Sequence, residues 1–153
     1  MEITDISKTF SRDTRHSVVT CVISLLQYYD ISINQNDLKE KIVINDKGEA
    51  TLSDITKTFE RFGLFAEGFR ANAVSNLDEL LNPAIIPVCF DDGREDFAIY
   101  YGKYEKRYLI GMPFWGLNLY TEWEIEAIWI NHILLEVKRY LQETAKKVQN
   151  KTG

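Results

Sequence analysis

The strongest pattern in the chain is a run of apolar side chains at residues 17–30 that fills almost every direction of a helical wheel. The apolar members of this run are Val18, Val19, Cys21, Val22, Ile23, Leu25, Leu26, Tyr28 and Tyr29. A helix that is apolar on all sides packs inside a domain rather than on its surface. The pattern therefore predicts a central buried helix that begins at Ser17.

Local signals predict two further helices before the middle of the chain. Asn34 is an N-cap for a short helix over residues 35–43, and residues 46–48 read as a turn. Thr51 caps an amphipathic helix that ends at residue 62, and Gly63 follows it as a terminating residue. The first part of the chain is therefore expected to be helical.

The second part of the chain has the short alternating runs that are typical of strands. Residues 77–81 read as a helical turn between the first two strands, and residues 91–93 and 104–106 read as hairpin connections. The expected strands are residues 64–70, 84–90, 96–104, 106–112, 117–120 and 132–137. Helices followed by antiparallel strands indicate an α+β fold.

Composition narrows the functional classes. A chain of 153 residues is long enough for one domain with a real core. The net charge of −5 argues against a nucleic-acid binder. Cys21 and Cys89 offer neither a disulfide framework nor metal spacing, which favours a reducing compartment, and no cofactor is expected. The polar residues 1–10 lack the apolar core of a signal peptide, and no apolar run is long enough to span a membrane.

The apolar helix resembles the first helix of the papain-like cysteine peptidase domains of bacteriocin exporters. That family opens the helix with Asp-Cys-Gly, has a small residue or Cys four positions later, and closes it with Tyr-Tyr-Gly. Counting back from Tyr28 and Tyr29, Cys21 takes the second of these positions and Ser17 falls on the nucleophile.

The resemblance continues in order along residues 11–138 and implies a papain-like fold for a domain of residues 1–138. The family has an Asp-Gly turn, a helix ending in Gly-Phe, an edge strand, a Leu-Pro-Ala-Ile strand, the catalytic His-Phe, an Asp-Pro pair and a Trp-x-Gly strand. The matching segments here are residues 46–48, 51–63, 64–70, 82–85, 96–97, 112–113 and 129–131.

The matched positions lack the chemistry of a cysteine peptidase. Ser17 replaces the thiol, Asp96 replaces the histidine, and Met112 replaces the carboxylate that orients the imidazole. The oxyanion glutamine is missing too, because no Gln precedes Gln27. An aspartate with an ordinary pKa near 3.9 is a poor base for a serine hydroxyl. The resemblance therefore implies a degenerate, non-catalytic domain, and a leader-trimming peptidase that uses Ser17 is the alternative.

Other groups with chemical potential have plainer interpretations. His16 precedes Ser17, but neighbouring side chains at a helix start diverge, so we interpret it as a capping or surface residue. His132 begins the last expected strand and is interpreted as structural. Residues 91–96 resemble a calcium loop but lack the ligand spacing of an EF-hand, so no metal site is expected.

Aromatic residues on or after the strands that border the former site are the candidates for peptide contact. In active relatives of the family, an extended leader segment lies in an apolar groove beside the catalytic helix. Tyr101, Phe114 and Trp115 are the candidates here, because exposed aromatic side chains concentrate binding energy. Core packing is the competing interpretation for Phe114 and Trp115.

The last residues, 139–153, are rich in lysine and arginine. They read either as a solvated C-terminal helix or as a juxtamembrane linker that follows the positive-inside bias. The resemblance implies an accessory domain of an ATP-driven (ABC-type) exporter at the cytoplasmic side of the bacterial inner membrane. Its partners would be a secreted peptide or unfolded polypeptide cargo and the transmembrane and nucleotide-binding domains of the same exporter. A stand-alone scaffold or immunity-type protein with the same fold is a third possibility.

Overall fold

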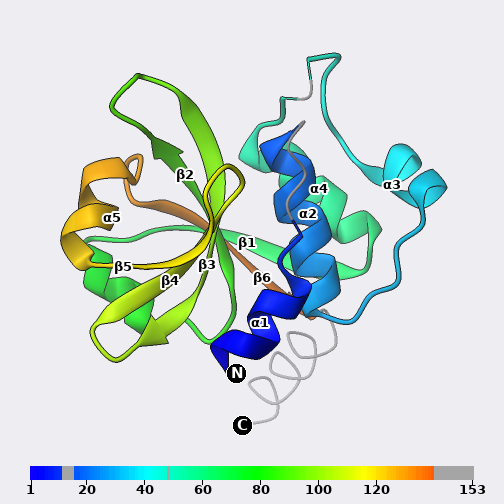
Figure 1. Cartoon of the computed structure of the whole chain (residues 1–153). Coiled ribbons are helices and arrows are strands. Elements are labelled where there is room, and N and C mark those ends of the chain that lie inside the picture. The colour runs from blue at the N-terminus through cyan, green and yellow to red at the C-terminus, as the bar shows by residue number, and fades with distance from the viewer. Residues whose placement is uncertain (12–15, 48, 140–153) are drawn as a thin grey trace, which may run out of the picture.

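The computed structural model describes residues 1–11, 16–47 and 49–139. Helices come first and lie together on one side of the molecule, as Figure 1 shows for α1, α2, α3 and α4. Their bounds are Ile3–Thr9 for α1, Ser17–Tyr28 for α2, Gln35–Lys41 for α3 and Leu52–Arg61 for α4. The prediction of helices followed by antiparallel strands is confirmed.

The strands form a six-stranded antiparallel sheet in the order β1-β6-β2-β3-β4-β5. The last strand thus lies between the first two. The strands are β1 Leu64–Arg70, β2 Ala84–Cys89, β3 Glu95–Tyr104, β4 Arg107–Met112, β5 Gly116–Tyr120 and β6 Ile133–Arg139. A 3₁₀ helix, Val74–Glu79, precedes β2, and the helix α5, Glu122–Ile128, precedes β6.

Helix α2 is the central helix that the apolar pattern predicted. It contacts α1, α4 and β3, and Cys21, Val22 and Leu25 on it are fully buried. Its C-terminal end is fastened to β6, because the Tyr29 hydroxyl donates a hydrogen bond to the Val137 carbonyl. The buried helix is therefore fixed at one end, and its other end, at Ser17, points toward the site described below.

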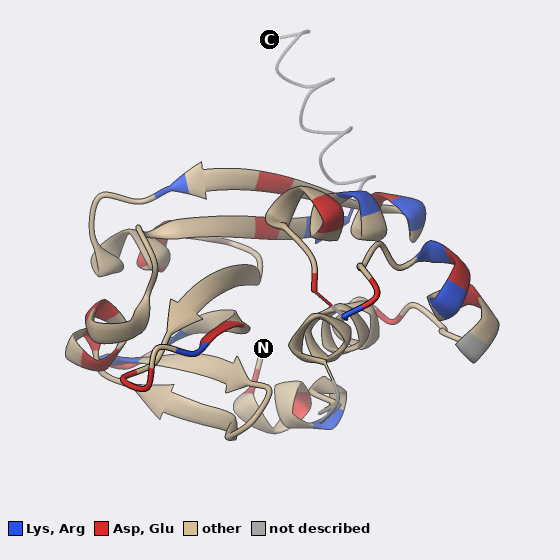
Figure 2. Cartoon of the chain, turned by 90° about the horizontal axis from the view of Figure 1, so that it is seen from above, with Lys and Arg blue, Asp and Glu red and all other residues tan. Residues whose placement is uncertain are grey.

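Two apolar cores lie on the two faces of the sheet. The first joins the helices to the face that carries Ile99 and Tyr101, and the second joins the opposite face to the 3₁₀ helix and α5. Alternate residues of β3 therefore belong to different cores, as the two-residue period of a strand requires. Charged positions are spread over the ribbon rather than gathered on one face (Figure 2).

Local capping explains why the predicted helix starts are right. The Asn34 side chain accepts a hydrogen bond from the Asp37 N–H at 2.8 Å. Thr51 and Asp54 form a reciprocal capping box at the start of α4, with bonds of 3.0 and 3.1 Å. Gly63 ends α4 with a φ of +86°, a conformation that side chains other than glycine rarely adopt.

Two helices were not predicted. In α1 the one buried residue is Ile6, and in α5 it is Ile125, so neither short helix has an apolar stripe that a sequence pattern could reveal. Residues 129–131, which were matched to a Trp-x-Gly strand, follow α5 instead. Their part in the sheet is an isolated bridge between Trp129 and Val88.

The sheet extends slightly beyond the expected domain boundary. Arg139 ends β6, pairs with Leu64 and donates a hydrogen bond from Nη2 to the Tyr29 carbonyl at 3.0 Å. The rest of the basic segment predicted at residues 139–153, residues 140–153, lies outside the described residues. None of the helices that the structure describes is both long and apolar enough to cross a bilayer.

Candidate functional site

Ser17 and Asp96 meet at a cavity between the start of α2 and the start of β3. The cavity has a volume of about 240 Å³, and its lining includes Ser17, Pro87, Asp96 and Phe97. Asp96 pairs with Val88 of β2, and its strand, β3, is an interior strand between β2 and β4. The expectation that the helix start faces the Asp96 strand is confirmed.

Asp96 is almost entirely buried, with 9% of its surface exposed. Its Oδ1 accepts a hydrogen bond from the Phe97 N–H at 2.9 Å, and its Oδ2 is buried without a hydrogen-bond partner among the described residues. Burial raises the pKa of this carboxyl, while the nearby Ser17 hydroxyl, the hydrogen bond from the Phe97 N–H and the charge of Arg94 oppose the rise. The cavity thus holds a carboxylate whose hydrogen-bonding capacity is only partly used.

Cys21 lies one turn beyond Ser17 on α2 and is fully buried. Burial, followed by the nearby charge of Asp96, raises the pKa of its thiol. A thiol must ionise to act as a nucleophile, so the raised pKa of Cys21 makes it a poor nucleophile.

Met112 does not line the cavity. Its side chain is 1% exposed and packs in the second core, on the sheet face that also buries Ala98 and Trp129. Among the three matched catalytic positions, the structure therefore joins Ser17 to Asp96 and leaves Met112 in an apolar environment. A thioether there offers almost no hydrogen bond to orient a catalytic group.

Neither histidine reaches the cavity lining. His16 is the residue before α2, in extended backbone, and its side chain makes no capping hydrogen bond. His132 lies beside the Trp129 ring, with ring centroids 4.8 Å apart, and its Nε2 is 3.0 Å from a carboxylate oxygen of Glu126. These contacts agree with the structural role expected for His132.

Tyr101 is not an exposed contact residue, so that expectation is wrong. It is 7% exposed and lies in the first core, against the rings of Phe10 and Tyr28. The reason is strand alternation, because Phe97, Ile99 and Tyr101 all project from β3 toward the helices.

Phe114 and Trp115 are exposed, at 44% and 53%. They belong to a group that we call the aromatic cluster: Phe90, Arg94, Phe114 and Trp115. The Arg94 guanidinium lies 5.1 Å from the ring centroid of Phe90, 4.6 Å from that of Phe114 and 5.3 Å from that of Trp115. The Trp115 ring also meets Phe90 edge-to-face, with centroids 4.7 Å apart.

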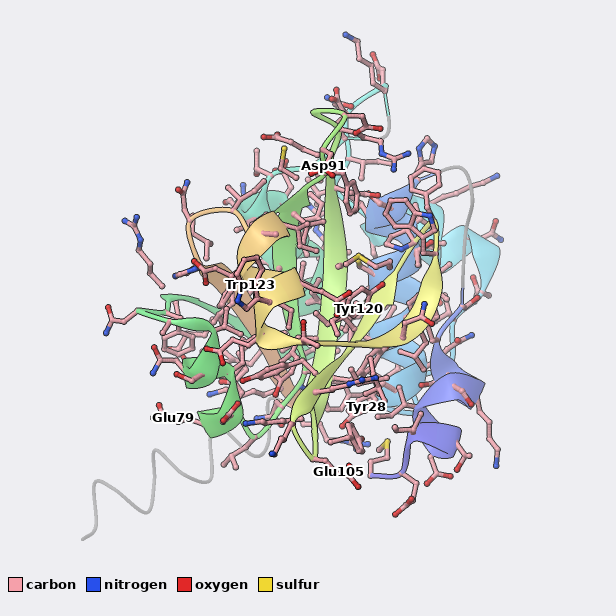
Figure 3. The ribbon with its side chains drawn as sticks, turned by 60° about the vertical axis from the view of Figure 1, so that its left-hand side comes forward. Tyr28, Glu79, Asp91, Glu105, Tyr120 and Trp123 are labelled. Atoms are coloured by element: carbon pink, nitrogen blue, oxygen red, sulfur yellow. The ribbon has the colours of Figure 1, made fainter. Side chains whose placement is uncertain are left out.

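The aromatic cluster and the cavity share the β2–β3 hairpin. Arg94 of the cluster directly precedes Glu95 and Asp96, which line the cavity. Figure 3 shows Asp91 near the tip of this hairpin, at the opposite end of the sheet from Glu105. Sequence reasoning missed the role of Arg94, because its aromatic partners Phe114 and Trp115 come from the separate β4–β5 hairpin.

Comparison with known proteins identifies relatives of this chain. The sequence profile of the peptidase C39 family matches residues 7–140. No curated protein sequence matches the chain.

Solved structures share the fold. The peptidase domain of Streptococcus ComA, a bifunctional ABC transporter involved in quorum sensing, has 18% identity, covers 84% of this chain and 95% of its own, and gives a TM-score of 0.70. A double-glycine-motif protease from an AMS/PCAT transporter, in complex with the leader peptide, has 20% identity over 85% and 89%, with a TM-score of 0.68.

A third neighbour is the N-terminal peptidase C39-like domain of the toxin secretion ATP-binding protein from Vibrio parahaemolyticus. It has 18% identity, covers 84% of this chain and 98% of its own, and gives a TM-score of 0.62. These similarities concern the fold, and the family profile covers nearly the whole described domain. The chain therefore belongs to the peptidase C39 family, as its order of motifs predicted.

Proposed function

We propose that this chain is a non-catalytic member of its family, a module that binds a secreted peptide or an unfolded polypeptide without cutting it. The observation that carries the proposal is the pairing of Ser17 with Asp96 at the cavity. A cysteine peptidase needs a thiolate, an imidazole that holds its proton and a group that orients the imidazole. No histidine of the described residues lines this cavity.

The aromatic cluster supports the binding half of the proposal. Phe114 and Trp115 keep about half of their surface exposed although aromatic rings gain free energy from burial. Arg94 and Phe90 hold these rings in place, so a bound peptide would order few protein side chains. Rigid, exposed aromatic groups are the usual anchors of peptide and protein interfaces.

The cellular setting that we propose follows from the relatives. ABC transporters, a leader-peptide complex and a toxin secretion protein appear among the structures with this fold. We accordingly propose that the domain serves an ATP-driven exporter at the cytoplasmic side of the bacterial inner membrane. There it would hold cargo close to the transmembrane and nucleotide-binding domains of the same exporter.

One observation favours the alternative, a leader-trimming peptidase that uses Ser17. The Ser17 hydroxyl lines the cavity beside Asp96, and burial raises the pKa of that carboxyl, which makes it a better base than an exposed aspartate. However, the base remains an aspartate, and no side chain of the described cavity lining supplies an imidazole. We therefore place this function second.

Binding can be measured with a fluorescein-labelled synthetic double-glycine leader peptide. We expect saturable fluorescence anisotropy with the intact chain, and at least about a tenfold loss of affinity for Trp115→Ala, as for an aromatic anchor. Trp123→Ala is the matched control, because Trp123 is 85% exposed on α5, outside the aromatic cluster (Figure 3).

The folded state is checked in the same samples by thermal unfolding. Trp115→Ala should leave the melting temperature nearly unchanged, as surface substitutions usually do. If it lowers the melting temperature by several degrees and the folded fraction still binds the peptide normally, Trp115 is a packing residue and the proposed surface is wrong. Equal losses of affinity in both tryptophan variants would also reject it.

A further inference from the structure

Three carboxylates surround the Ser17–Asp96 cavity. Glu49, Glu95 and Asp96 line it together with the Ser17 hydroxyl, and no lysine or arginine of the described residues is part of the lining. Glu49 and Glu95 are exposed, whereas Asp96 is buried. Among the described residues the lining thus carries three acidic groups and no basic one, and Arg94, outside the lining, offsets only part of the charge of Asp96.

The buried side chain of Asp96 supplies a second, independent observation. Its Oδ2 is buried and lacks a hydrogen-bond partner among the described residues, although Oδ1 accepts from the Phe97 N–H. A buried polar atom without a partner costs free energy, and such atoms are rare in folded proteins. The missing partner is a hydrogen-bond donor, and a positively charged donor would form the strongest bond.

The spacing of the acids argues for an organic cation rather than a metal ion. No three Asp, Glu, His or Cys side chains among the described residues come close enough together to hold a metal. A guanidinium carries five N–H donors in a planar fork and can reach several separated acceptors at once. It also suits a cavity whose other lining groups include the apolar Pro87 and Phe97.

We propose that the cavity receives an arginine side chain of the bound peptide, with Asp96 as the buried acceptor and Glu95 and Glu49 as the charged rim. This inference rests on the proposed function, because it names the side-chain class that the peptide site recognises. The carboxylate that stands in place of the imidazole then has a binding role of its own. At position 96, where an active relative would carry the histidine, the carboxylate binds a cationic group of the cargo.

The geometry links this cavity to the aromatic cluster. Glu95 and Asp96 follow Arg94 directly on the hairpin, so an extended peptide can place an apolar residue on Trp115 and an arginine near Asp96. The guanidinium of Arg94 lies over the rings of Phe114 and Trp115 and is not part of the cavity lining.

The test uses a small probe that does not depend on the aromatic cluster. The ¹⁵N-labelled chain is titrated with N-acetyl-argininamide, and with N-acetyl-citrullinamide as the neutral analogue of the same shape. We expect saturable amide shifts confined to Ser17, Val18, Asp96 and Phe97 with the arginine probe, and affinity at least about tenfold weaker for citrulline.

Two variants and one control assign the binding to the cavity. Asp96→Asn and Glu95→Gln should each weaken the arginine probe, the first by at least about tenfold. Glu60→Gln removes the same charge from an exposed position of α4 and should leave affinity within about twofold of the original. The amide spectrum of each variant reports directly whether it is folded.

Equal affinity for the arginine and citrulline probes, unchanged binding in Asp96→Asn, or no saturable shift at the cavity would each overturn the inference. The leader-peptide titration separates this failure from failure of the proposed function. If the peptide still binds and still depends on Trp115, the binding module stands and the arginine site falls.

Discussion

Asp96 is the residue whose burial and ionisation lead to the most direct predictions. The folded chain buries a carboxylate and gives it a hydroxyl, a backbone N–H and a nearby arginine as partial compensation. Burial favours the neutral form of such a carboxyl, so its pKa is higher in the folded chain than in the unfolded chain. Its cost to folding therefore depends on pH, and the direction of this dependence can be stated.

Asp96→Asn should raise the free energy of unfolding at pH 7. The pKa of Asp96 is raised in the folded state from an ordinary 3.8, so the folded chain binds the proton more tightly than the unfolded chain does. The stability that this proton provides is complete below pH 3.8 and is lost as the pH rises through the raised pKa. We therefore expect the free energy of unfolding of Asp96→Asn at pH 7 to exceed that of the original chain, because asparagine carries no charge to bury.

Urea unfolding at several pH values measures this difference. The gain should shrink toward zero as the pH falls to the ordinary pKa of an aspartate, and Glu60→Gln on exposed α4 should show no comparable gain. A loss of stability in Asp96→Asn at pH 7 would mean that the ionised carboxylate has a strong partner, contrary to the geometry described above.

Ser17→Cys should not create a reactive nucleophile. The new thiol would face a carboxylate, which disfavours the thiolate, and no described histidine lines the cavity. Iodoacetamide labelling at pH 7, followed by peptide mapping, should find the thiol at position 17 alkylated no faster than a free cysteine. The Ser17→Cys/Asp96→His double variant supplies an imidazole and should react faster. Rapid labelling in the single variant would show that another group activates the position.

At the scale of elements, the sequence was most informative where structure is determined locally. The α2 pattern, the caps at Asn34 and Thr51 and the glycine after α4 predicted three helices, because each signal involves groups a few residues apart. The helices α1 and α5 were missed because each buries a single side chain and depends on packing for its stability.

The contact between α1 and the sheet is one such long-range feature. A side chain at Gly111 of β4 would meet the ring of Phe10, with a Cβ placed 2.4 Å from a ring carbon. Gly111→Ala should therefore displace Phe10, which follows α1 and contacts the Tyr101 ring. Overpacking of this kind costs about 1–3 kcal/mol, which lowers the melting temperature by several degrees.

Gly68→Ala is the matched control on β1, because a Cβ there has an ordinary contact of 3.9 Å with the Leu134 carbonyl oxygen. Its melting temperature should stay the same or rise slightly, since alanine costs less entropy than glycine in a strand. If both alanine variants unfold at the same temperature, Phe10 does not pack on Gly111 and the position of α1 needs revision.

For the whole molecule, the order of motifs was enough to predict the family, the α+β fold and the meeting of Ser17 with Asp96. The burial of Tyr101 could have been read from strand alternation. The aromatic cluster could not, because Arg94 and Trp115 come from separate hairpins that only the folded sheet brings together. Position along the chain therefore predicted the Ser17–Asp96 site better than it predicted the aromatic cluster beside it.

The most direct test of the central claim measures binding and cleavage in one experiment. The chain is mixed with a synthetic double-glycine leader peptide, binding is followed by fluorescence anisotropy, and the peptide is examined by mass spectrometry after prolonged incubation. We predict a saturable complex in which the peptide remains intact, both for the original chain and for Ser17→Ala. Cleavage after the double glycine that disappears in Ser17→Ala would contradict the account and establish Ser17 as a nucleophile.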